Sequence, residues 1–515
     1  MTLESLVVLP VAVPLVAAGF ALAAARRPRL QRLVSVLALS LVLAVAVVLL
    51  LAANGGATLV VDVGGWAAPV GIALVVDRLS ALMLLVSSIV ILVVMVYSLA
   101  QGVADGDEGA PVAIYHPTYL VLAAGVSTAF LSGDLFNIYV GFEMLLAASF
   151  VLLTLRGTGE RVRAGTIYVV VSLLSSVLFL VAIALVYAAT GTVNLAQLAQ
   201  RLPEIDADVR LALQVMLMLA FAIKAAVFPL SAWLPDSYPT APAPVTAVFA
   251  GLLTKVGIYA MIRTQTLLFP EGRLDTLLLW AALVTMVVGI LGAVAQDDIK
   301  RLLSFTLVSH IGYMVFGIAL SSQAGLSAAI FYVAHHITVQ TSLFLVAGLI
   351  ERRGGTTSLA RLGSLARLAP VLAVLFFLPA MNLAGIPPLS GFLGKVGLIE
   401  AGVQDGRALV YALVVGGLLT SLLTLYAVAK AWNKAFWQEA PGPLRERPSP
   451  RGMVTAAGAL VVVGLAITVF AGPLYAYTDA AAQSLRDRTT YVTAVLPDGE
   501  RGGGRSAEVA EGSTP

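Results

Sequence analysis

The stretch LVSVLALSLVLAVAVVLLLAA, from Leu33 to Ala53, decides the class of this protein. It holds no charged residue, and a helix of roughly 20 apolar residues is what a bilayer core of about 30 Å requires. Similar stretches recur from Ser5 to Phe470 and are separated by short polar segments. The sequence therefore predicts an all-α polytopic membrane protein with no soluble domain between its helices.

The composition of the whole chain supports this class and restricts its chemistry. Of the 515 residues, 59% are hydrophobic and 11% are charged. The mean hydropathy of +0.96 exceeds what a soluble globular domain sustains. The chain has no cysteine, which excludes disulfides, iron–sulfur clusters, thiolate zinc sites and cysteine nucleophiles. We therefore expect no cofactor and no metal in this chain, and any redox chemistry would belong to a partner.

The apolar stretches predict about fourteen transmembrane helices. The least clear division lies between Thr118 and Leu155, where Ser132-Gly133-Asp134 interrupts the run; we interpret it as a hairpin with Asp134 as the N-cap of the second helix. The predicted helices are Ser5–Ala25, Leu33–Ala53, Leu79–Ala100, Thr118–Leu131, Asp134–Leu155, Ala164–Thr190, Arg210–Phe228, Thr240–Gln265, Asp275–Ala295, Arg301–Leu320, Gln323–Ile350, Leu368–Ala401, Ala408–Trp437 and Met453–Gly472.

The basic residues of the loops predict the orientation. Odd-numbered loops hold eighteen lysines and arginines, whereas the even-numbered loops and the C-terminal segment hold ten, Arg263 among them. Because cytoplasmic loops carry the excess of basic residues, we expect both termini outside. The net charge of +3 is spread over many short loops, so it indicates topology and not a nucleic-acid surface.

Three lysines remain after the loop residues are set aside: Lys224, Lys255 and Lys395. A lysine at mid-helix costs roughly 2.5–3.5 kcal/mol on insertion scales and usually has a function. The alternative is that each ammonium reaches the interface on its flexible stem. Lys224 and Lys255 lie too far from the helix ends for their ammonium groups to reach the interface easily. The depth of Lys395 depends on where its helix resumes after a Pro-rich break.

Glu143 is the acidic residue that lies clearly in mid-helix. A buried carboxylate needs a proton or a cationic partner, so a pair of Glu143 with a lysine could hold or release a proton, or could simply be structural. The adjacent His335 and His336 could relay protons, whereas His310 is interpreted as a satisfied polar contact. Bis-histidine haem ligation has no other support in the sequence.

A short match between two segments of the sequence, here called the Pro-Leu-Ser echo, predicts internal repeats. Pro229–Leu234 recurs as Pro388–Leu393, five helices later. An odd offset gives the copies opposite orientations, as in transporters built from inverted repeats with broken helices; ordinary proline kinks or coincidence are the alternative. We predict broken helices seven and twelve. The expected divisions are an N-terminal three-helix segment at 1–117, five-helix repeats at 118–266 and 267–437, a C-terminal helix at 438–477 and a polar, disordered tail at 478–515.

Several of these stretches together resemble the antiporter-like subunit family. That family comprises the large membrane subunits of respiratory complex I, the membrane subunits of related hydrogenases and the Mrp-type sodium/proton antiporters. The resemblance extends from about helix three to helix thirteen. The matching segments are Gly133–Tyr139 with Phe142-Glu143, Lys224 ahead of Phe228–Pro235, Leu253–Tyr259, Asp298–Leu303, Ser309–Tyr313 and Gly385–Phe392.

The resemblance implies a fourteen-helix fold with two inverted five-helix repeats, and it assigns site residues. Many relatives carry a lysine in helix eleven where this chain has Gln340, which puts a relay through that helix in doubt. The implied proton pathway consists of Glu143, Lys224, Lys255, His335 or His336, and Lys395.

The resemblance also implies a function. The chain length and the segments Asp134–Asn137 and Thr254–Tyr259 most resemble the D-type branch of the Mrp antiporter subunits. The lysine at Lys395 argues against the M-type subunit of complex I. We expect a proton-translocating subunit of a multisubunit Na+/H+ antiporter in a bacterial inner membrane, working with other subunits and not an enzyme. The alternatives are a proton-pumping subunit of an NADH:quinone oxidoreductase or membrane-bound hydrogenase, and a scaffold whose charges only hold helices together.

Overall fold

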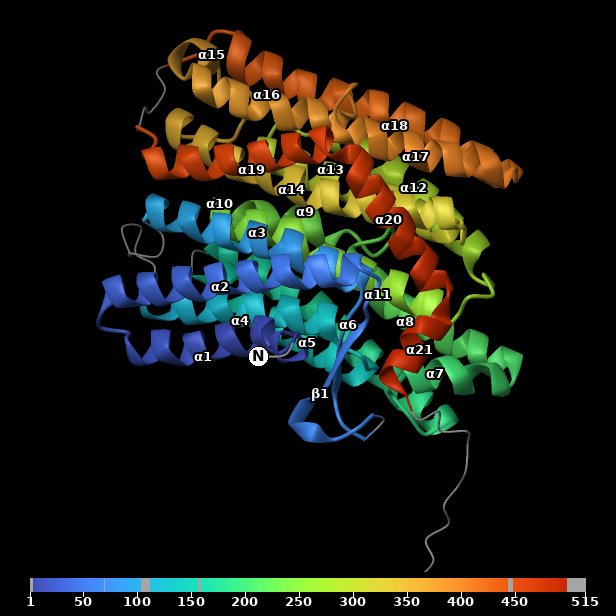
Figure 1. Cartoon of the computed structure of the whole chain (residues 1–515). Coiled ribbons are helices and arrows are strands. Elements are labelled where there is room, and N and C mark those ends of the chain that lie inside the picture. Colours follow the sequence, from blue (N-terminus) through green and yellow to red (C-terminus); the bar gives the residue numbers. More distant parts are fainter. Residues whose placement is uncertain (1–2, 69, 103–111, 156–158, 443–447, 498–515) are drawn as a thin grey trace, which may run out of the picture.

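The computed structural model describes residues 3–68, 70–102, 112–155, 159–442 and 448–497. Long helices lie side by side, with the N-terminal helices at one end of the row and α16 and α18 at the other (Figure 1). The described ranges contain twelve helices that are long and apolar enough to cross a membrane. They correspond to every predicted helix except the seventh and the twelfth. The polytopic all-α class is therefore confirmed, while the count of fourteen stays a prediction.

The N-terminal region contains a small hairpin that was not predicted from the sequence. Its two strands pair antiparallel, with Leu59 opposite Val76. Directly after it, the Asp77 side chain accepts a hydrogen bond from Ser80 N and completes a capping box at the start of α3. The elements are α1 (Leu9–Ala23), α2 (Pro28–Asn54), β1 (Leu59–Asp62), β2 (Ala73–Val76) and α3 (Arg78–Gln101).

The predicted hairpin at Gly133-Asp134 is present. Asp134 caps the second helix, because its carboxylate accepts a hydrogen bond of 2.6 Å from Asn137 N. A short helix that was not predicted, α7, follows Asn194, whose side chain caps it. The elements are α4 (Val112–Leu131), α5 (Leu135–Thr154), α6 (Gly159–Thr190) and α7 (Leu195–Arg201).

Both copies of the Pro-Leu-Ser echo lie at helix breaks, as predicted. The residue that caps the helix before the first break is Ala226, with φ 59°, and the one that caps the helix before the second is Gly385, with φ 84°. The pieces α16 and α17 are 15 and 16 residues long, each too short to span a bilayer core at about 1.5 Å per residue. The elements around the breaks are α8 (Ala207–Ala225), α9 (Trp233–Ser237), α10 (Ala243–Val248), a π-helical turn (Phe249–Leu253), α11 (Thr254–Leu267), α15 (Leu365–Leu368), α16 (Pro370–Ala384) and α17 (Ser390–Asp405).

The centre of the fold is formed by helices that are enclosed by others. Every residue of α14 from Gly325 to Ile350 is buried, whereas α1 buries only a third of its apolar window. A helix surrounded by protein on all sides cannot send its polar side chains to lipid or bulk water, so the polar residues of α14 must find partners inside. The elements of the second half are α12 (Asp275–Val294), α13 (Ile299–Ala319), α14 (Gln323–Gly354), α18 (Ala408–Trp432) and α19 (Arg451–Val469).

The prediction of a disordered tail from residue 478 is wrong for residues 478–497. There the chain forms the rest of α20 (Ala471–Arg486) and α21 (Arg488–Val495). The composition is polar, but Thr478, Ala481, Ala482 and Leu485 recur at helical spacing and are buried. Figure 1 shows the two helices crossing the row obliquely and ending beside α7 and the β hairpin. The remainder of the predicted tail, 498–515, lies outside the described residues.

Candidate functional site

Glu143 and Lys224 lie on facing helices near one end of the helix row. Lys224 occupies the last turn of α8, and its Nζ lies 5.5 Å from the ring centroid of Phe142, the neighbour of Glu143 in α5. Within the described part of the chain, Lys224 Nζ and Glu143 Oε1 are buried atoms without a hydrogen-bond partner. The contact ion pair considered from the sequence is therefore not formed. Neither side chain has a fixed ion-pair partner among the described residues.

Lys255 lies at the middle of the protein. It is fully buried in α11, and its Nζ donates a 2.6 Å hydrogen bond to the carbonyl of Ala250. Ala250 belongs to the π-helical turn that directly precedes α11, and such turns are frequent at functional sites. A buried ammonium bound to one carbonyl retains donors for further partners.

Histidines and a tyrosine form a buried cluster between α13 and α14. The rings of His310 and His336 are 5.2 Å apart, and His310 Nδ1 is 2.8 Å from Tyr332 Oη. His335 Nδ1 lies 3.0 Å from Ser390 Oγ, at the second helix break. Among the described residues, neither ring nitrogen of His336 has a hydrogen-bond partner. Among the described residues, His336 is thus the histidine of the cluster with no hydrogen bond on its ring, whereas His310 and His335 each have one bonded nitrogen and one without a partner.

Lys395 is held by the second break. Its Nζ donates to the carbonyls of Leu383 (3.2 Å) and Ala384 (3.0 Å) and to Ser421 Oγ (2.9 Å). Those carbonyls belong to the last turn of α16, where helix geometry leaves acceptors unpaired and the helix dipole favours a cation. The ammonium also lies 5.2 Å from the Tyr313 ring centroid. The break therefore creates the site that binds the lysine.

Gln340 is buried in α14 and donates a 2.7 Å hydrogen bond to the Leu303 carbonyl. An amide side chain has no titratable proton at neutral pH. Gln340 therefore acts as a hydrogen-bonding group, and the titratable side chains nearby are the histidines. Among the described residues there is no group of three or more His, Cys, Asp or Glu that could hold a metal ion.

Part of this cluster was not predicted from the sequence. His310 does make the polar contact that was expected, with Tyr332, but it also lies against His336 and beside Tyr313, to whose ring its own is 5.6 Å distant. The available signal was the spacing of His310 and Tyr313, three residues apart on one helix face. The cluster thus contains three histidines and two tyrosines rather than two histidines alone.

Arg263 was wrongly placed among the loop residues. It lies within α11 with 2% of its surface exposed, and it makes two hydrogen bonds with Asp77, of 2.6 and 2.9 Å. The sequence contained a signal for it, because Lys255, Tyr259 and Arg263 follow each other at intervals of four on one helix face. A second buried basic residue therefore belongs to the helix that carries Lys255.

Comparison with known proteins places this geometry in context. Residues 132–424 match the family described as NADH:quinone oxidoreductase/Mrp antiporter, TM. The D-type subunit of the Na(+)/H(+) antiporter from Alkalihalophilus pseudofirmus is 38% identical over 96% of this chain and 100% of its own length.

Two solved structures extend the comparison to the fold. A chain of the Mrp complex from Dietzia sp. DQ12-45-1b superposes with a TM-score of 0.89 at 36% identity, over 96% of this chain and all of that one. A chain of respiratory complex I from Thermus thermophilus superposes with a TM-score of 0.77 at 26% identity, over 93% of this chain and 99% of that one.

Proposed function

Because the chain belongs to the NADH:quinone oxidoreductase/Mrp antiporter family of membrane proteins, we propose that it is a proton-translocating subunit of a multisubunit Na+/H+ antiporter. It works as an ion transporter subunit within an assembly of other membrane subunits, and it is not an enzyme. The pathway we propose follows Glu143, Lys224, Lys255, the histidine cluster with His335 and His336, and Lys395.

The observation that carries this proposal is the continuity of titratable groups through a fully enclosed interior. Lys255, His336 and His335 are 0% exposed, and Lys395 is 4% exposed. Ionisable groups inside a membrane protein are costly and usually mark an ion pathway. Protonation of one member changes the charge seen by the next, so protons can move stepwise along the row.

The alternative is a proton-translocating arm of a redox enzyme. The match to the complex I chain supports the shared fold, but the Mrp chain is more similar in both sequence and structure. The full-length relative with 38% identity is an antiporter subunit. Identifying the subunits that copurify with this chain separates the two assemblies directly.

We further propose that the protein resides in a bacterial inner membrane with both termini outside. The position of Arg263 inside α11 removes one residue from the side that carried ten basic residues. The bias becomes eighteen against nine, which strengthens the positive-inside argument.

The test removes the two charges that have no fixed partner. Glu143→Ala and Lys224→Ala are each expected to abolish Na+-driven proton movement in membrane vesicles while the complex still assembles. Immunoblots of the purified complex serve as the control. Transport that survives either change contradicts the pathway, and loss of assembly in both would support the scaffold alternative.

A further inference from the structure

A second charged site lies where α3 begins and α11 ends. Asp77 and Arg263 form a two-point ion pair, with side chains only 13% and 3% exposed. Burial alone would raise the pKa of Asp77, but the Arg263 charge, its hydrogen bonds and those from Ser80 together hold that pKa below its usual value. Asp77 is therefore an ionised carboxylate inside the fold.

Arg263 is enclosed by two tyrosines from different parts of the chain. Its guanidinium carbon lies 5.5 Å from the ring centroid of Tyr259 in α11 and 5.1 Å from that of Tyr491 in α21. Arg263 Nη2 also donates a 3.3 Å hydrogen bond to Tyr259 Oη. The C-terminal helix thus covers the ion pair from the side of the protein surface.

Tyr259 connects this pair to the centre of the protein. Lys255, Tyr259 and Arg263 are spaced by four residues in α11, and residues at that spacing are neighbours on one helix face, about 5–6 Å apart between Cβ atoms. The Tyr259 hydroxyl is itself buried and donates a 2.7 Å hydrogen bond to the Phe130 carbonyl. The contacts of Tyr259 with Arg263 and of Arg263 with Asp77 therefore lie on the face of α11 that also carries Lys255, whose ammonium is itself bound to the Ala250 carbonyl.

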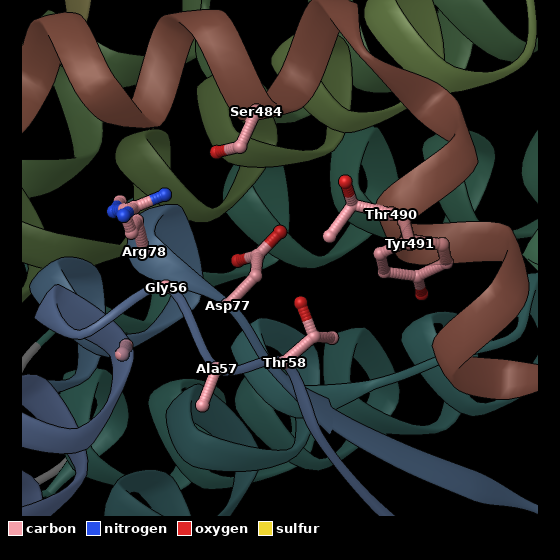
Figure 2. A pocket seen from close by; sticks show the side chains of 9 residues that line it. Gly56, Ala57, Thr58, Asp77, Arg78, Ser484, Thr490 and Tyr491 are labelled. Atoms are coloured by element: carbon pink, nitrogen blue, oxygen red, sulfur yellow. The ribbon is translucent and has the colours of Figure 1, made fainter.

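A small polar cavity lies next to Asp77. It has a volume of about 20 Å³ and is lined by Asp77 and Arg78, by hydroxyls of Thr58, Ser484 and Thr490, and by Tyr491. A cavity of about 10–15 Å³ already holds one water if polar partners surround it. Figure 2 shows the side chains of Asp77, Thr58, Ser484 and Thr490 converging on the cavity from the hairpin and from the C-terminal helices.

We propose that Asp77 is the group through which the proton pathway reaches the aqueous face formed by the β hairpin and α21, with Arg263 as the positioning residue that keeps this exit closed. The inference rests on the proposed function. In the closed state Arg263 neutralises Asp77. When the pair separates, the buried carboxylate loses its counter-charge and accepts a proton.

The proposed step conserves protons at each position. In this step the Lys255 ammonium leaves the Ala250 carbonyl and the Tyr259 hydroxyl leaves the Phe130 carbonyl. The hydroxyl then takes one proton from Lys255 and gives its own to Asp77, so Lys255 becomes neutral, Tyr259 is unchanged and Asp77 becomes a neutral acid. Asp77 then releases that proton to water in the cavity. The titratable or charged groups that surround Asp77 in this step are Arg78, Arg263, Tyr259, Tyr477 and Tyr491.

The first experiment separates a proton-carrying role of Asp77 from a structural one. We expect Asp77→Asn to assemble and to lower antiport in proteoliposomes by at least about tenfold, as loss of a proton-transfer group does. Asp77→Glu should retain most of the antiport with a shifted pH profile. The double variant Asp77→Asn with Arg263→Gln replaces the buried pair by neutral groups, which is often tolerated structurally, and should assemble yet stay deficient. Antiport restored to the wild-type level by the double variant would overturn the proposal.

The second experiment tests the cavity without removing a charge. The chain has no native cysteine, so Thr490→Cys can be modified by a cationic methanethiosulfonate on the purified complex before reconstitution. Thr493→Cys, exposed on the same helix but outside the cavity lining, is the matched control. We expect modification to block antiport at Thr490→Cys and a thiol reductant to restore it, with no effect at Thr493→Cys. Equal activity of the two modified variants would overturn the proposal, and this result decides alone if the Asp77 variants fail to assemble.

A variant at the centre of the pathway distinguishes failure of the exit from failure of the proposed function. If Lys255→Met abolishes antiport while Asp77→Asn and modified Thr490→Cys transport normally, the exit is wrong and the proposed function stands. If all three transport normally, the proposed function itself fails.

Discussion

The two helix breaks place a lysine beside the carbonyl end of an interrupted helix, but they treat the two ammonium groups differently. Lys395 donates three hydrogen bonds at the end of α16, whereas Lys224, in the last turn of α8, has no hydrogen-bond partner among the described residues. Both positions favour a cation electrostatically. In the proposed pathway, Lys395 therefore keeps one set of hydrogen bonds, while Lys224 and Glu143 are the residues that change partners.

The largest expected effect distinguishes these two lysines. Lys395→Met and Lys224→Met should both abolish antiport, but only Lys395→Met should also destabilise the protein. It leaves the Leu383 carbonyl without its donor, and a buried unsatisfied acceptor costs about 1–3 kcal/mol. The Ala384 carbonyl keeps a hydrogen bond from Ser421. Thermal unfolding of the purified complex, followed by fluorescence-detected gel filtration, measures this. Equal melting temperatures for the two variants would contradict the claim that the hydrogen bonds of Lys395 stabilise the protein and that Lys224 has no such role.

The sequence was sufficient for the membrane class and for both breaks. Apolar length and the Pro-Leu-Ser echo depend on local sequence, and local sequence determines where a helix can span or must stop. The helices of the C-terminal segment were missed because the tail was judged by composition, although its buried positions follow helical periodicity. The β hairpin was missed because it is short and lies between two far stronger apolar signals.

For the candidate site, the sequence alone could single out residues that are unusual for their environment, namely Lys224, Lys255, Lys395 and Glu143. Contacts between helices were not predictable, because sequence spacing does not say which helices meet. His310 could therefore be placed against His336, and Arg263 against Asp77 across 186 positions, only from the structure.

The second largest expected effect is a difference in antiport between variants of the two adjacent histidines. His335 is bound to Ser390 at the break, whereas both ring nitrogens of His336 lack hydrogen-bond partners among the described residues. Replacement by glutamine at His336 removes a proton carrier and should reduce antiport by about tenfold or more. The same replacement at His335 retains a hydrogen-bonding side chain and should reduce antiport less. Initial rates of dye-reported proton movement in proteoliposomes provide the measurement, and a larger loss at His335 would reverse the assignment.

The smallest effect concerns the cap of the helix that carries Glu143. Burial raises the pKa of Asp134 to about 6, although the Asn137 and Phe136 amides act against it. Because the folded protein binds this proton more tightly than the unfolded chain, the stabilisation is complete below the unfolded pKa of 3.8 and is lost as pH rises through about 6.

Asp134→Asn keeps a capping oxygen and removes this titration. Between pH values of about 5 and 7.5, the melting temperature of the parent should fall by about 1–2 °C relative to that of the variant. If the melting temperatures of the parent and the variant change equally between these pH values, Asp134 is not protonated in the folded protein.

The most direct test of the charged pathway is made at its centre, between the two regions compared above. Lys255 is fully buried and lies between the unpartnered charges of the first break and the bound lysine of the second. Lys255→Met keeps much of the side-chain volume and removes the charge. Na+-driven proton movement should be measured in proteoliposomes that contain the intact assembled complex. We expect complete loss of antiport with normal assembly, and antiport at the parental rate would show that the charged pathway is wrong.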